Sequence, residues 1–359
     1  MITISLCMIV RDEEDVLSRC LESVKEIADE IIIVDTGSQD HTKAIAAQYT
    51  DKIFDFPWID DFSAARNFAF AQASQEYCLW LDADDVILPE EQEKFMELKK
   101  TLDPKTDVVM MKYHTVFDTA GNPTFTYYRE RLLKNGRGFQ WQGAIHETIT
   151  PTGNIIHSDI AIAHKKLHPS DPDRNLRIFT KQKEKGIPFN PREEFYYARE
   201  LYYHQQYAEA IQVFQQFLVN PGGWLENKID ACQLLANCYQ ETNQPDFALS
   251  ALFQSFFYDT PRGEACCAIG KHFLEKKQYQ QAIYWYQTAL SCQPQPQKGG
   301  FVRLDCYGYI PAIQLCVCYD KIGQKEQAQA YNELAGKYKP NDAAYLYNKA
   351  YFDQQIQTN

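Results

Sequence analysis

A short apolar run at residues 77–81 ends in three carboxylates, Asp82, Asp84 and Asp85, with Ala83 between the first two. An apolar run of this length, with aromatic residues and neither Gly nor Pro, predicts a buried strand, and the carboxylates then lie just past its carboxyl end. Ligands bind at that edge of open α/β sheets. Carboxylates held together on a turn repel one another unless a cation or hydrogen-bond donors lie between them, and Mg²⁺ and Mn²⁺ prefer such oxygen ligands. The pattern therefore indicates either a metal site for a diphosphate or an acidic turn that caps a helix.

The first 100 residues alternate between strand patterns and helix patterns. The strand patterns are at residues 2–10, 30–34, 52–56 and 77–81. Apolar residues at helical spacing follow each of the first three, and a further helix is predicted from Pro89 to about residue 100. This alternation predicts a parallel, doubly wound α/β sheet with right-handed crossovers. Asp35, which follows the second strand, is then expected at the same edge of the sheet as Asp82.

The next 60 residues have a different pattern. Residues 107–117, 124–134 and 138–142 are rich in β-branched and aromatic side chains, which predicts hairpin strands. They lead to the adjacent residues His146 and Glu147, which follow a Gly-containing turn. A last strand pattern then ends at His164.

From about residue 192 the chain has the pattern of a helical repeat. An aromatic residue followed by small residues recurs in the second helix of three helix pairs, at residues 207–211, 247–250 and 279–283, and residues 325–328 are a weaker fourth copy. Aligning Ala210, Ser250, Ala282 and Ala328 gives steps of 40, 32 and 46 residues, close to the tetratricopeptide period of about 34 once insertions are allowed. A stack of helix pairs is therefore predicted, with an ordinary helical bundle as the alternative.

Composition limits the compartment and the partners. The net charge of −12 argues against sequence-independent binding to nucleic acid or to anionic lipid, because both need a basic face. No apolar run approaches the length of a membrane span, and the apolar N-terminus is followed at once by charged residues, as expected of a strand and not of a signal peptide. Most of the eleven cysteines lie within apolar patterns, which fits buried thiols in a reducing compartment. A cytoplasmic protein without a nucleic-acid partner or a membrane span is predicted.

Four segments in a fixed order carry a resemblance to a known family: residues 5–14, 33–40, 64–69 and 81–85. In their order and spacing they resemble the family-two nucleotide-sugar glycosyltransferases of the GT-A fold. With residues 145–147 and the repeat tail, the whole chain is similar to the subgroup that includes the S-glycosyltransferases modifying the bacteriocin sublancin. The resemblance implies a Rossmann-like GT-A domain at residues 1–168, a linker at 169–191 and a tetratricopeptide-like repeat domain at 192–359. It also implies inverting, metal-dependent transfer from a UDP-sugar to a peptide or protein acceptor.

The same resemblance assigns roles to residues at the predicted sheet edge. Those expected to bind the nucleotide sugar are Val10, Arg11, Glu13, Asp35, Arg66, Asp82, Ala83, Asp84 and Arg131. Asp84 is expected to ligate Mn²⁺ or Mg²⁺, Asp82 to contact the ribose or the metal, and Asp35 to accept the uracil N–H. Arg66 is expected to contact the base or the diphosphate through its planar donors. An ordinary surface salt bridge is the alternative for Arg66.

The catalytic base is expected at His146 or Glu147. An inverting displacement needs a group that deprotonates the acceptor, and both residue types can do this. If Glu147 is the base, His146 would complete the metal shell; if His146 is the base, Glu147 would orient it. A histidine packed in the core is the structural alternative, and His164 is a further candidate metal ligand.

The repeat tail carries many aromatic side chains, and the exposed ones are expected to form a site for a polypeptide. That polypeptide is either the acceptor or a second copy of the chain, so a homodimer through the repeats is predicted. Two other functions remain open. One is transfer to a saccharide or lipid-linked acceptor, and the other is a repeat scaffold that binds a nucleotide sugar without turning it over.

Overall fold

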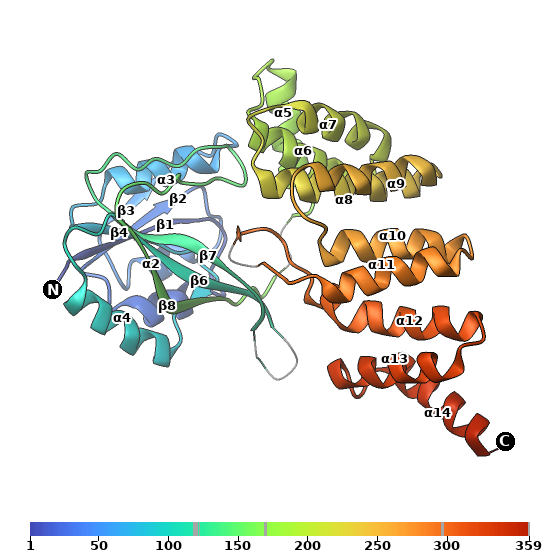
Figure 1. The fold of residues 1–359 in the computed structure, drawn as a ribbon. Helices are drawn as coiled ribbons and strands as arrows, with labels where there is room; N and C mark the ends of the chain where they lie inside the picture. Colours follow the sequence, from blue (N-terminus) through green and yellow to red (C-terminus); the bar gives the residue numbers. More distant parts are fainter. Residues whose placement is uncertain (118–120, 122, 169–170, 296–297, 358–359) are drawn as a thin grey trace. The chain divides into compact units, whose positions relative to one another are not determined.

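The computed structural model describes residues 1–117, 121, 123–168, 171–295 and 298–357. The chain forms two compact units, Met1–Ile187 and Pro188–Asn359 (Figure 1). The first is a mixed α/β unit and the second is entirely helical. The predicted order of an α/β domain followed by an all-α repeat domain is confirmed.

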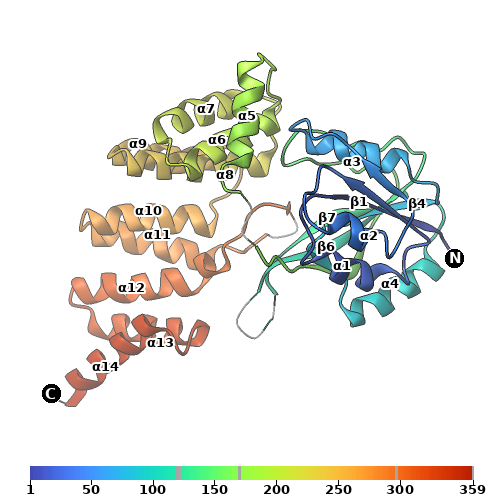
Figure 2. The same cartoon turned by 180° about the vertical axis from the view of Figure 1, so that it is seen from behind.

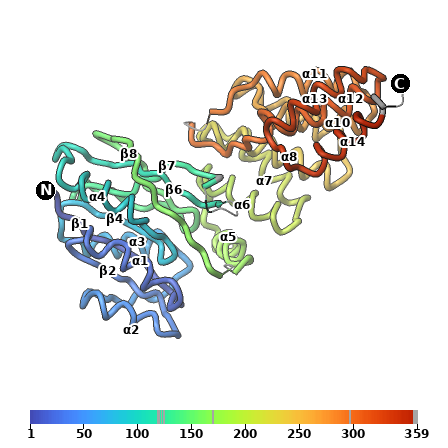
Figure 3. The backbone as a smooth tube through the Cα atoms, turned by 90° about the horizontal axis from the view of Figure 1, so that it is seen from below, coloured from blue at the N-terminus to red at the C-terminus, as the bar shows by residue number. Residues whose placement is uncertain are grey.

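An eight-stranded sheet forms the centre of the first unit, in the order β3-β2-β1-β4-β7-β6-β8-β5. The strands are β1 (Ile4–Val10), β2 (Glu30–Asp35), β3 (Ile53–Asp55), β4 (Tyr77–Trp80), β5 (Asp85–Val86), β6 (Val108–Phe117), β7 (Pro123–Lys134) and β8 (Ile155–His164). The first four are parallel, as the strand and helix alternation predicts. The later strands join the same sheet in mixed directions: β7 is antiparallel to β4 and β6, β6 is parallel to β8, and β5 is antiparallel to β8. Figure 3 shows β6, β7 and β8 side by side.

Helices cover both faces of the parallel part of the sheet (Figures 1 and 2). The helices of this unit are α1 (Leu17–Val24), α2 (Thr42–Ala46), α3 (Phe62–Ala71), α4 (Pro89–Thr101) and α5 (Arg174–Glu184). Leu6 and Met8 of β1 pack in one buried cluster with α1 and α4, whereas Cys7 packs in another with Ala69 of α3. Alternate side chains of a strand point to opposite faces, so β1 is buried on both sides and its sequence is apolar throughout.

Local sequence explains where α3 and α4 begin. The side chain of Asp61 caps α3 by accepting from the Ala64 N–H at 2.9 Å. Pro89 occupies the first turn of α4, where its missing N–H costs nothing, and acidic residues in the first turn with lysines in the last complement the helix dipole.

Two segments differ from the sequence prediction. Residues 138–142 are not a strand: their only ladder contact among the described residues is the isolated bridge between Gln142 and Thr148. Left-handed glycines at 136, 138 and 143 turn the backbone away from an extended path. The segment 169–191, predicted as a linker, contains α5. Residues 169–170 lie outside the described part of the chain, and Lys181 of α5 is bonded to Asp60 at 2.6 Å within the first unit.

The second unit is a series of antiparallel helix pairs, followed by a single helix. Its helices are α6 (Pro191–Tyr203), α7 (Tyr207–Val219), α8 (Leu225–Glu241), α9 (Pro245–Gln254), α10 (Gly263–Glu275), α11 (Tyr279–Ser291), α12 (Tyr309–Lys321), α13 (Lys325–Tyr338) and α14 (Ala343–Gln357), with 3₁₀ turns η1 (Ser255–Phe257) and η3 (Leu304–Tyr307). The pairs α6/α7, α8/α9, α10/α11 and α12/α13 pack on one another in chain order (Figure 1). This arrangement is the tetratricopeptide-like stack that the repeat pattern predicts.

The same turn joins the two helices of every pair. In each, a left-handed residue is followed by a glutamine whose N–H donates to the carbonyl five residues earlier, as in a Schellman motif. These glutamines are Gln206, Gln244, Gln278 and Gln324, with N···O distances of 2.9, 2.7, 2.8 and 2.9 Å. Four residues later stand Ala210, Ala248, Ala282 and Ala328, all fully buried. The sequence alignment on Ser250 is therefore wrong, because Ser250 is exposed, and the true steps are 38, 34 and 46 residues.

Candidate active site

The loops that follow β1 and β2 are hydrogen-bonded to each other at the carboxyl edge of the sheet. Asp12, whose backbone is left-handed (φ 53°), accepts from the Gln39 N–H at 2.7 Å, and its own N–H donates to Ser38 Oγ at 3.0 Å. The Glu13 N–H donates to Thr42 Oγ1 at 2.7 Å. The acidic loop after β1 is thereby held against the start of α2.

Val10 and Asp35 end neighbouring strands and are paired in register. Asp35 is only 3% exposed, and its carboxylate accepts from the Gly37 N–H at 3.1 Å and the Ser38 N–H at 3.1 Å. A carboxylate offers about four acceptor positions, so Asp35 retains capacity for a further donor. Arg11 is exposed and lies 3.7 Å from the carboxylate of Asp12.

After β4 the chain forms a tight turn whose two ends bond to each other. The Asp82 N–H donates to Asp85 Oδ2 at 3.1 Å, and the Asp85 N–H donates to the Asp82 carbonyl at 3.0 Å. Asp85 is fully buried, where it accepts from Arg131 Nη1 at 3.0 Å and from the Tyr113 hydroxyl at 2.8 Å. The Arg131 guanidinium lies 3.7 Å from the ring centroid of Trp80. Arg131 itself has no exposed surface, so its contacts here neutralise Asp85 instead of facing a phosphate.

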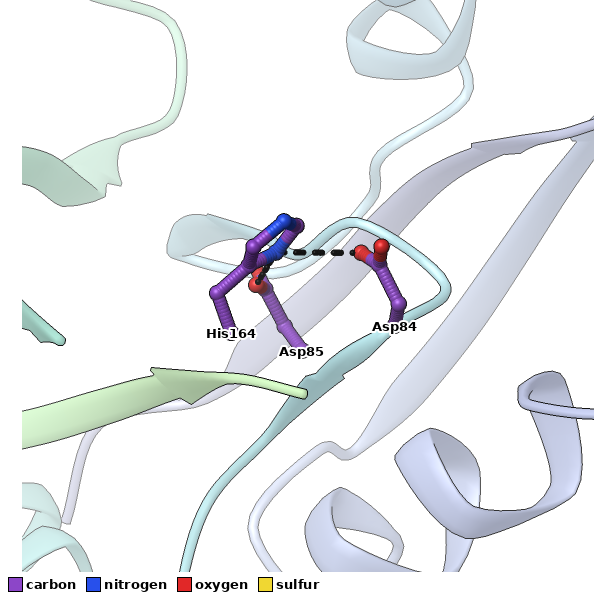
Figure 4. Close-up of side chains that lie close together, drawn as sticks. All are labelled: Asp84, Asp85 and His164. Atoms are coloured by element: carbon purple, nitrogen blue, oxygen red, sulfur yellow. Dashed lines mark hydrogen bonds and ion pairs between the residues drawn. The ribbon is translucent and has the colours of Figure 1, made fainter. Parts of the chain in front are cut away.

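A candidate metal centre lies beside this turn (Figure 4). His164 Nδ1 is 3.2 Å from Asp84 Oδ1 and 3.3 Å from Asp85 Oδ1, and it is 2.9 Å from the Tyr113 hydroxyl. Antiparallel pairing of β5 with β8 places Asp85 opposite His164. Ligand atoms of these three residues lie within 4.8 Å of one another, the one such group in the described part of the chain, and it does not include His146. Burial lowers the pKa of His164, but its hydrogen bonds to Asp84 and Asp85 outweigh this and raise that pKa to about 10.

An excess of carboxylate charge surrounds the candidate metal centre. Burial, together with the nearby carboxylates of Asp84 and Asp82, raises the pKa of Glu13 to about 7. Ala83, between the two aspartates, is buried. A divalent cation at Asp84 and His164 would relieve this repulsion, and oxygen ligands with one imidazole suit Mn²⁺ or Mg²⁺. The residues present therefore fit such an ion.

Arg66 of α3 connects the turn after β4 with a distant loop. Its Nη2 donates to Asp82 Oδ1 at 2.6 Å and its Nε to Glu147 Oε1 at 2.7 Å. The guanidinium lies 5.1 and 4.9 Å from the ring centroids of Trp80 and Trp141. Burial raises the pKa of Asp82, but the charge of Arg66 outweighs burial and lowers that pKa to about 2. Arg66 is buried and paired with two carboxylates, so it is not a surface salt bridge.

Glu147 lies on a loop, residues 141–148, that is closed by its own hydrogen bonds. The N–H of Gln142 donates to the Thr148 carbonyl at 3.0 Å, and the N–H of Thr148 donates to the Gln142 carbonyl at 3.1 Å. At the far side of the loop, the Phe62 N–H at the start of α3 donates to the Ala144 carbonyl at 2.9 Å. The loop is therefore attached to α3 by main-chain as well as side-chain contacts.

Two features of the 141–148 loop are not evident from the sequence. His146 has a left-handed backbone (φ 51°), as does Gly143 (φ 93°). Asn67 of α3 binds both main-chain groups of Trp141: its Nδ2 donates to the Trp141 carbonyl at 3.0 Å and its Oδ1 accepts from the Trp141 N–H at 2.8 Å. Asn67 lies next to Arg66 in one of the segments that carry the family resemblance. No sequence pattern, however, relates its amide to a residue 74 positions away.

Residues 5–162 match the family model described as "Glycosyl transferase family 2". A TPR repeat-containing protein of Synechococcus elongatus is 40% identical over 42% of this chain and 36% of its own length. The prophage-derived glycosyltransferase SunS of Bacillus subtilis is 27% identical over 69% of this chain and 61% of its own length. The lipopolysaccharide core biosynthesis glycosyltransferase LpsC of Rhizobium meliloti is 30% identical over 42% of this chain and 58% of its own length.

The chain thus spans less than two thirds of each of these relatives. The family match covers most of the sheet, the turn after β4 and the 141–148 loop, so the contacts of the candidate site lie within it except those of His164. Among the described helices, none combines the length and the apolar character needed to cross a membrane.

Proposed function

We propose that this chain, whose N-terminal unit is a family 2 glycosyltransferase domain, is an inverting, metal-dependent transferase that moves a sugar from a UDP-sugar to a polypeptide. The observation that carries the proposal is the position of Arg66 between Asp82 and Glu147, next to the Asp84–Asp85–His164 group. The buried guanidinium of Arg66 thereby links the metal side of the site to Glu147, a carboxylate that can act as a base.

Donor binding is assigned to the loops at the carboxyl edge. Asp84 and His164 would hold Mn²⁺ or Mg²⁺, which when bound stabilises the negative charge that grows on a leaving diphosphate. Asp35 would accept the uracil N–H with its remaining acceptor capacity. Asp85 would stabilise the turn after β4. It would not bind the donor, because its carboxylate already accepts from Arg131 and Tyr113.

Proton transfer is assigned to Glu147. The acceptor attacks the anomeric carbon while the bond to the diphosphate breaks, and the acceptor's proton passes to the Glu147 carboxylate. Arg66 would orient that carboxylate, since its Nε holds one of the two oxygens and leaves the other free of this bond. His146 is the second candidate base, in which case Glu147 would orient it.

A cavity in the second unit, with polar side chains in its lining, supports a polypeptide acceptor. It has a volume of about 540 Å³ and is lined mainly by α8 and α10, with further side chains from α12 and the segment before it and with Leu252 of α9 and Tyr286 of α11. Asp230, Gln233 and Asn237 line it at one-turn spacing along α8, and Gln233 Oε1 has no partner among the described residues. Burial raises the pKa of Asp230 to about 6, against the lowering effect of Arg199. A polypeptide segment would offer N–H donors to these acceptors.

A saccharide acceptor is the second candidate. It is favoured by the similarity to LpsC, which is named for lipopolysaccharide core biosynthesis. That similarity covers 42% of the chain, whereas the similarity to SunS covers 69%.

A transfer assay tests the proposal. The purified full-length chain is incubated with a panel of UDP-sugars, with and without Mn²⁺, in the presence of candidate polypeptides or oligosaccharides. We expect Mn²⁺-dependent release of UDP and a mass increase of one sugar on a polypeptide, both abolished by Glu147→Gln. Mass increase on oligosaccharides alone would replace the polypeptide by the second candidate. UDP binding without any turnover would leave the chain a nucleotide-sugar-binding scaffold.

Self-association through the repeats belongs to the same proposal. Phe257 and Tyr284 are 88% and 62% exposed, and Phe253 packs beside Trp285 at 5.5 Å between ring centroids. Apolar surface of this kind is favourable to bury against a second copy. Light scattering is expected to give twice the monomer mass, and Phe257→Ser with Tyr284→Ser should restore the monomer; a monomeric wild type would remove the claim.

A further inference from the structure

We infer that Asn67 is a positioning residue for the proposed reaction, because its side-chain amide holds the 141–148 loop on α3 and so brings Glu147 to Arg66. The inference rests on the proposed function for its catalytic consequence, whereas the structural part stands on the hydrogen bonds alone.

The two hydrogen bonds between Asn67 and Trp141 replace those of a missing strand neighbour. Both main-chain groups of Trp141 are bonded to this one amide, at 3.0 and 2.8 Å. An asparagine side chain has one donor group and one acceptor group with the geometry of a peptide, so it can satisfy both at once. Residues 138–141 are not in a ladder, and without Asn67 these groups would lose their partners where the site is partly buried.

The position of Glu147 depends on how the loop is held from outside. The Gln142–Thr148 bonds close the loop but do not orient it, and its backbone contains two left-handed residues, Gly143 and His146. Its polar contacts with α3 are the Asn67 pair, the bond from the Phe62 N–H and the Arg66–Glu147 ion pair. The Trp141 ring also packs against Arg66 and Phe70 of α3. The Asn67 pair can be removed by Asn67→Ala, a neutral side-chain substitution that leaves both the charges of the site and the main chain of α3 unchanged.

Loss of the Asn67 pair should therefore act on turnover more than on donor binding. Misplacement of a catalytic group by about 1 Å can cost roughly 100-fold in rate. In the proposed function Asp35, Asp84 and His164 bind UDP and the metal. They lie at the end of β2, after β4 and at the end of β8, whereas the side-chain hydrogen bonds of Asn67 go to Trp141.

Asn135 offers a matched control. Its Nδ2 also donates to two main-chain carbonyls that follow α3, those of Ala73 at 3.1 Å and Gln75 at 3.0 Å. It lies next to Lys134, which pairs with Tyr77 at the amino end of β4. Asn135→Ala therefore removes a comparable set of bonds at the opposite end of the strand from Asp82.

The experiment compares full-length wild type, Asn67→Ala, Asn67→Asp and Asn135→Ala. Asp keeps the acceptor for the Trp141 N–H but loses the donor to its carbonyl. Three quantities are measured: amide hydrogen exchange of residues 141–148, UDP affinity by calorimetry with Mn²⁺, and the kcat and KM of UDP release from the UDP-sugar that wild type turns over.

We expect both Asn67 variants to exchange faster than wild type at residues 141–148 and to lose at least about tenfold in kcat. For the neutral variant Asn67→Ala, UDP affinity and KM should stay within about twofold of wild type. Asn135→Ala should leave both the exchange of this loop and kcat unchanged. Equal loop exchange in Asn67→Ala and Asn135→Ala would overturn the inference, as would faster loop exchange with an unchanged kcat. If wild type turns over no nucleotide sugar, the proposed function fails, and the exchange comparison still decides whether Asn67 positions the loop.

Discussion

Two arginine–aspartate pairs flank the turn after β4, and they differ in what they leave open. Arg131 binds Asp85 and Arg66 binds Asp82, and both guanidinium groups lie over the ring of Trp80. The side chains of Arg131 and Asp85 have no exposed surface, whereas those of Arg66 and Asp82 are 8% and 35% exposed. The same pair of residue types is therefore enclosed on one side of the turn and accessible on the other.

The difference shows that an ion pair with an aspartate does not by itself distinguish a structural arginine from one that takes part in the reaction. Arg131 Nε and Nη2 have no hydrogen-bond partner in the described part of the chain, and the guanidinium lies against the rings of Trp80 and Tyr113. Because Arg131 has no exposed surface, its contacts with Asp85 and the two rings are out of reach of a ligand. Arg66 instead spans two carboxylates from separate parts of the chain, and the exposed fraction of Asp82 leaves room for a ligand to reach this pair.

The largest expected effect is a loss of stability when the enclosed Arg131–Asp85 pair is broken. Arg131→Met leaves the Asp85 carboxylate buried without its cation, which should lower the stability of the first unit by about 3–5 kcal/mol. Scanning calorimetry measures the shift of its unfolding transition. The double variant with Asp85→Asn should recover part of the loss, because no unpaired charge remains. A stability loss for Arg131→Met no larger than that for Arg66→Gln would contradict the comparison.

The accessible pair should affect turnover more than folding. Arg66→Gln removes a fixed cation from the site, and we expect kcat to fall about 100-fold or more, with a smaller change in the unfolding transition than for Arg131→Met. Arg66→Lys should not restore activity, since a single ammonium cannot bind Asp82 and Glu147 in the planar geometry of a guanidinium. Wild-type kcat in Arg66→Lys would show that charge alone suffices.

A substitution of Asp84 tests the metal site independently of the two arginine pairs. Asp84→Asn should weaken the Mn²⁺-dependent part of UDP binding by at least about tenfold and leave metal-independent UDP binding and the unfolding transition unchanged. Calorimetry of UDP binding with and without Mn²⁺ measures this. The control is Asp15→Asn, an exposed carboxylate that contacts His168 at 2.9 Å outside the site. UDP binding by wild type that does not depend on Mn²⁺ would remove the metal assignment.

The smallest effect concerns the pH dependence of stability. The pKa of Glu13 is raised to about 7 in the folded chain, against about 4.3 when unfolded. The folded state therefore binds more protons between these values, and stability falls as the pH rises from about 4 to 7. Glu13→Gln should raise the free energy of unfolding at pH 8 by on the order of 1 kcal/mol or less given solvent screening, seen as a higher melting temperature, and should have no effect near pH 4. Mn²⁺ should reduce the difference between the variant and wild type; a larger difference with Mn²⁺ would contradict this account.

Much of the fold follows from patterns that a single segment carries. The apolar run at 77–81 and the alternation of strands with helices predict the parallel part of the sheet, because burial on both faces leaves a continuous apolar strand. The acids at its end predict the site, because the carboxyl ends of parallel strands meet at one edge. Helical spacing in the tail predicts stacked pairs, but alignment on Ser250 gives the wrong register, because Ala248 is the buried position. The register of the repeats is marked instead by the glutamine that follows each left-handed turn residue. These glutamines are Gln206, Gln244, Gln278 and Gln324.

The amino-acid sequence by itself therefore determined the two-part architecture and the acidic edge of the sheet, since each depends on residues close together in the chain. Only the tertiary structure decided which side chains meet there. Arg131 reaches Asp85 because β7 pairs beside β4, and Arg66 reaches Glu147 across 81 positions because Asn67 and Phe62 hold the 141–148 loop on α3. The spacing of residues along a strand or helix reports which face they share, whereas contacts between distant segments depend on strand order and loop geometry, which no local periodicity encodes.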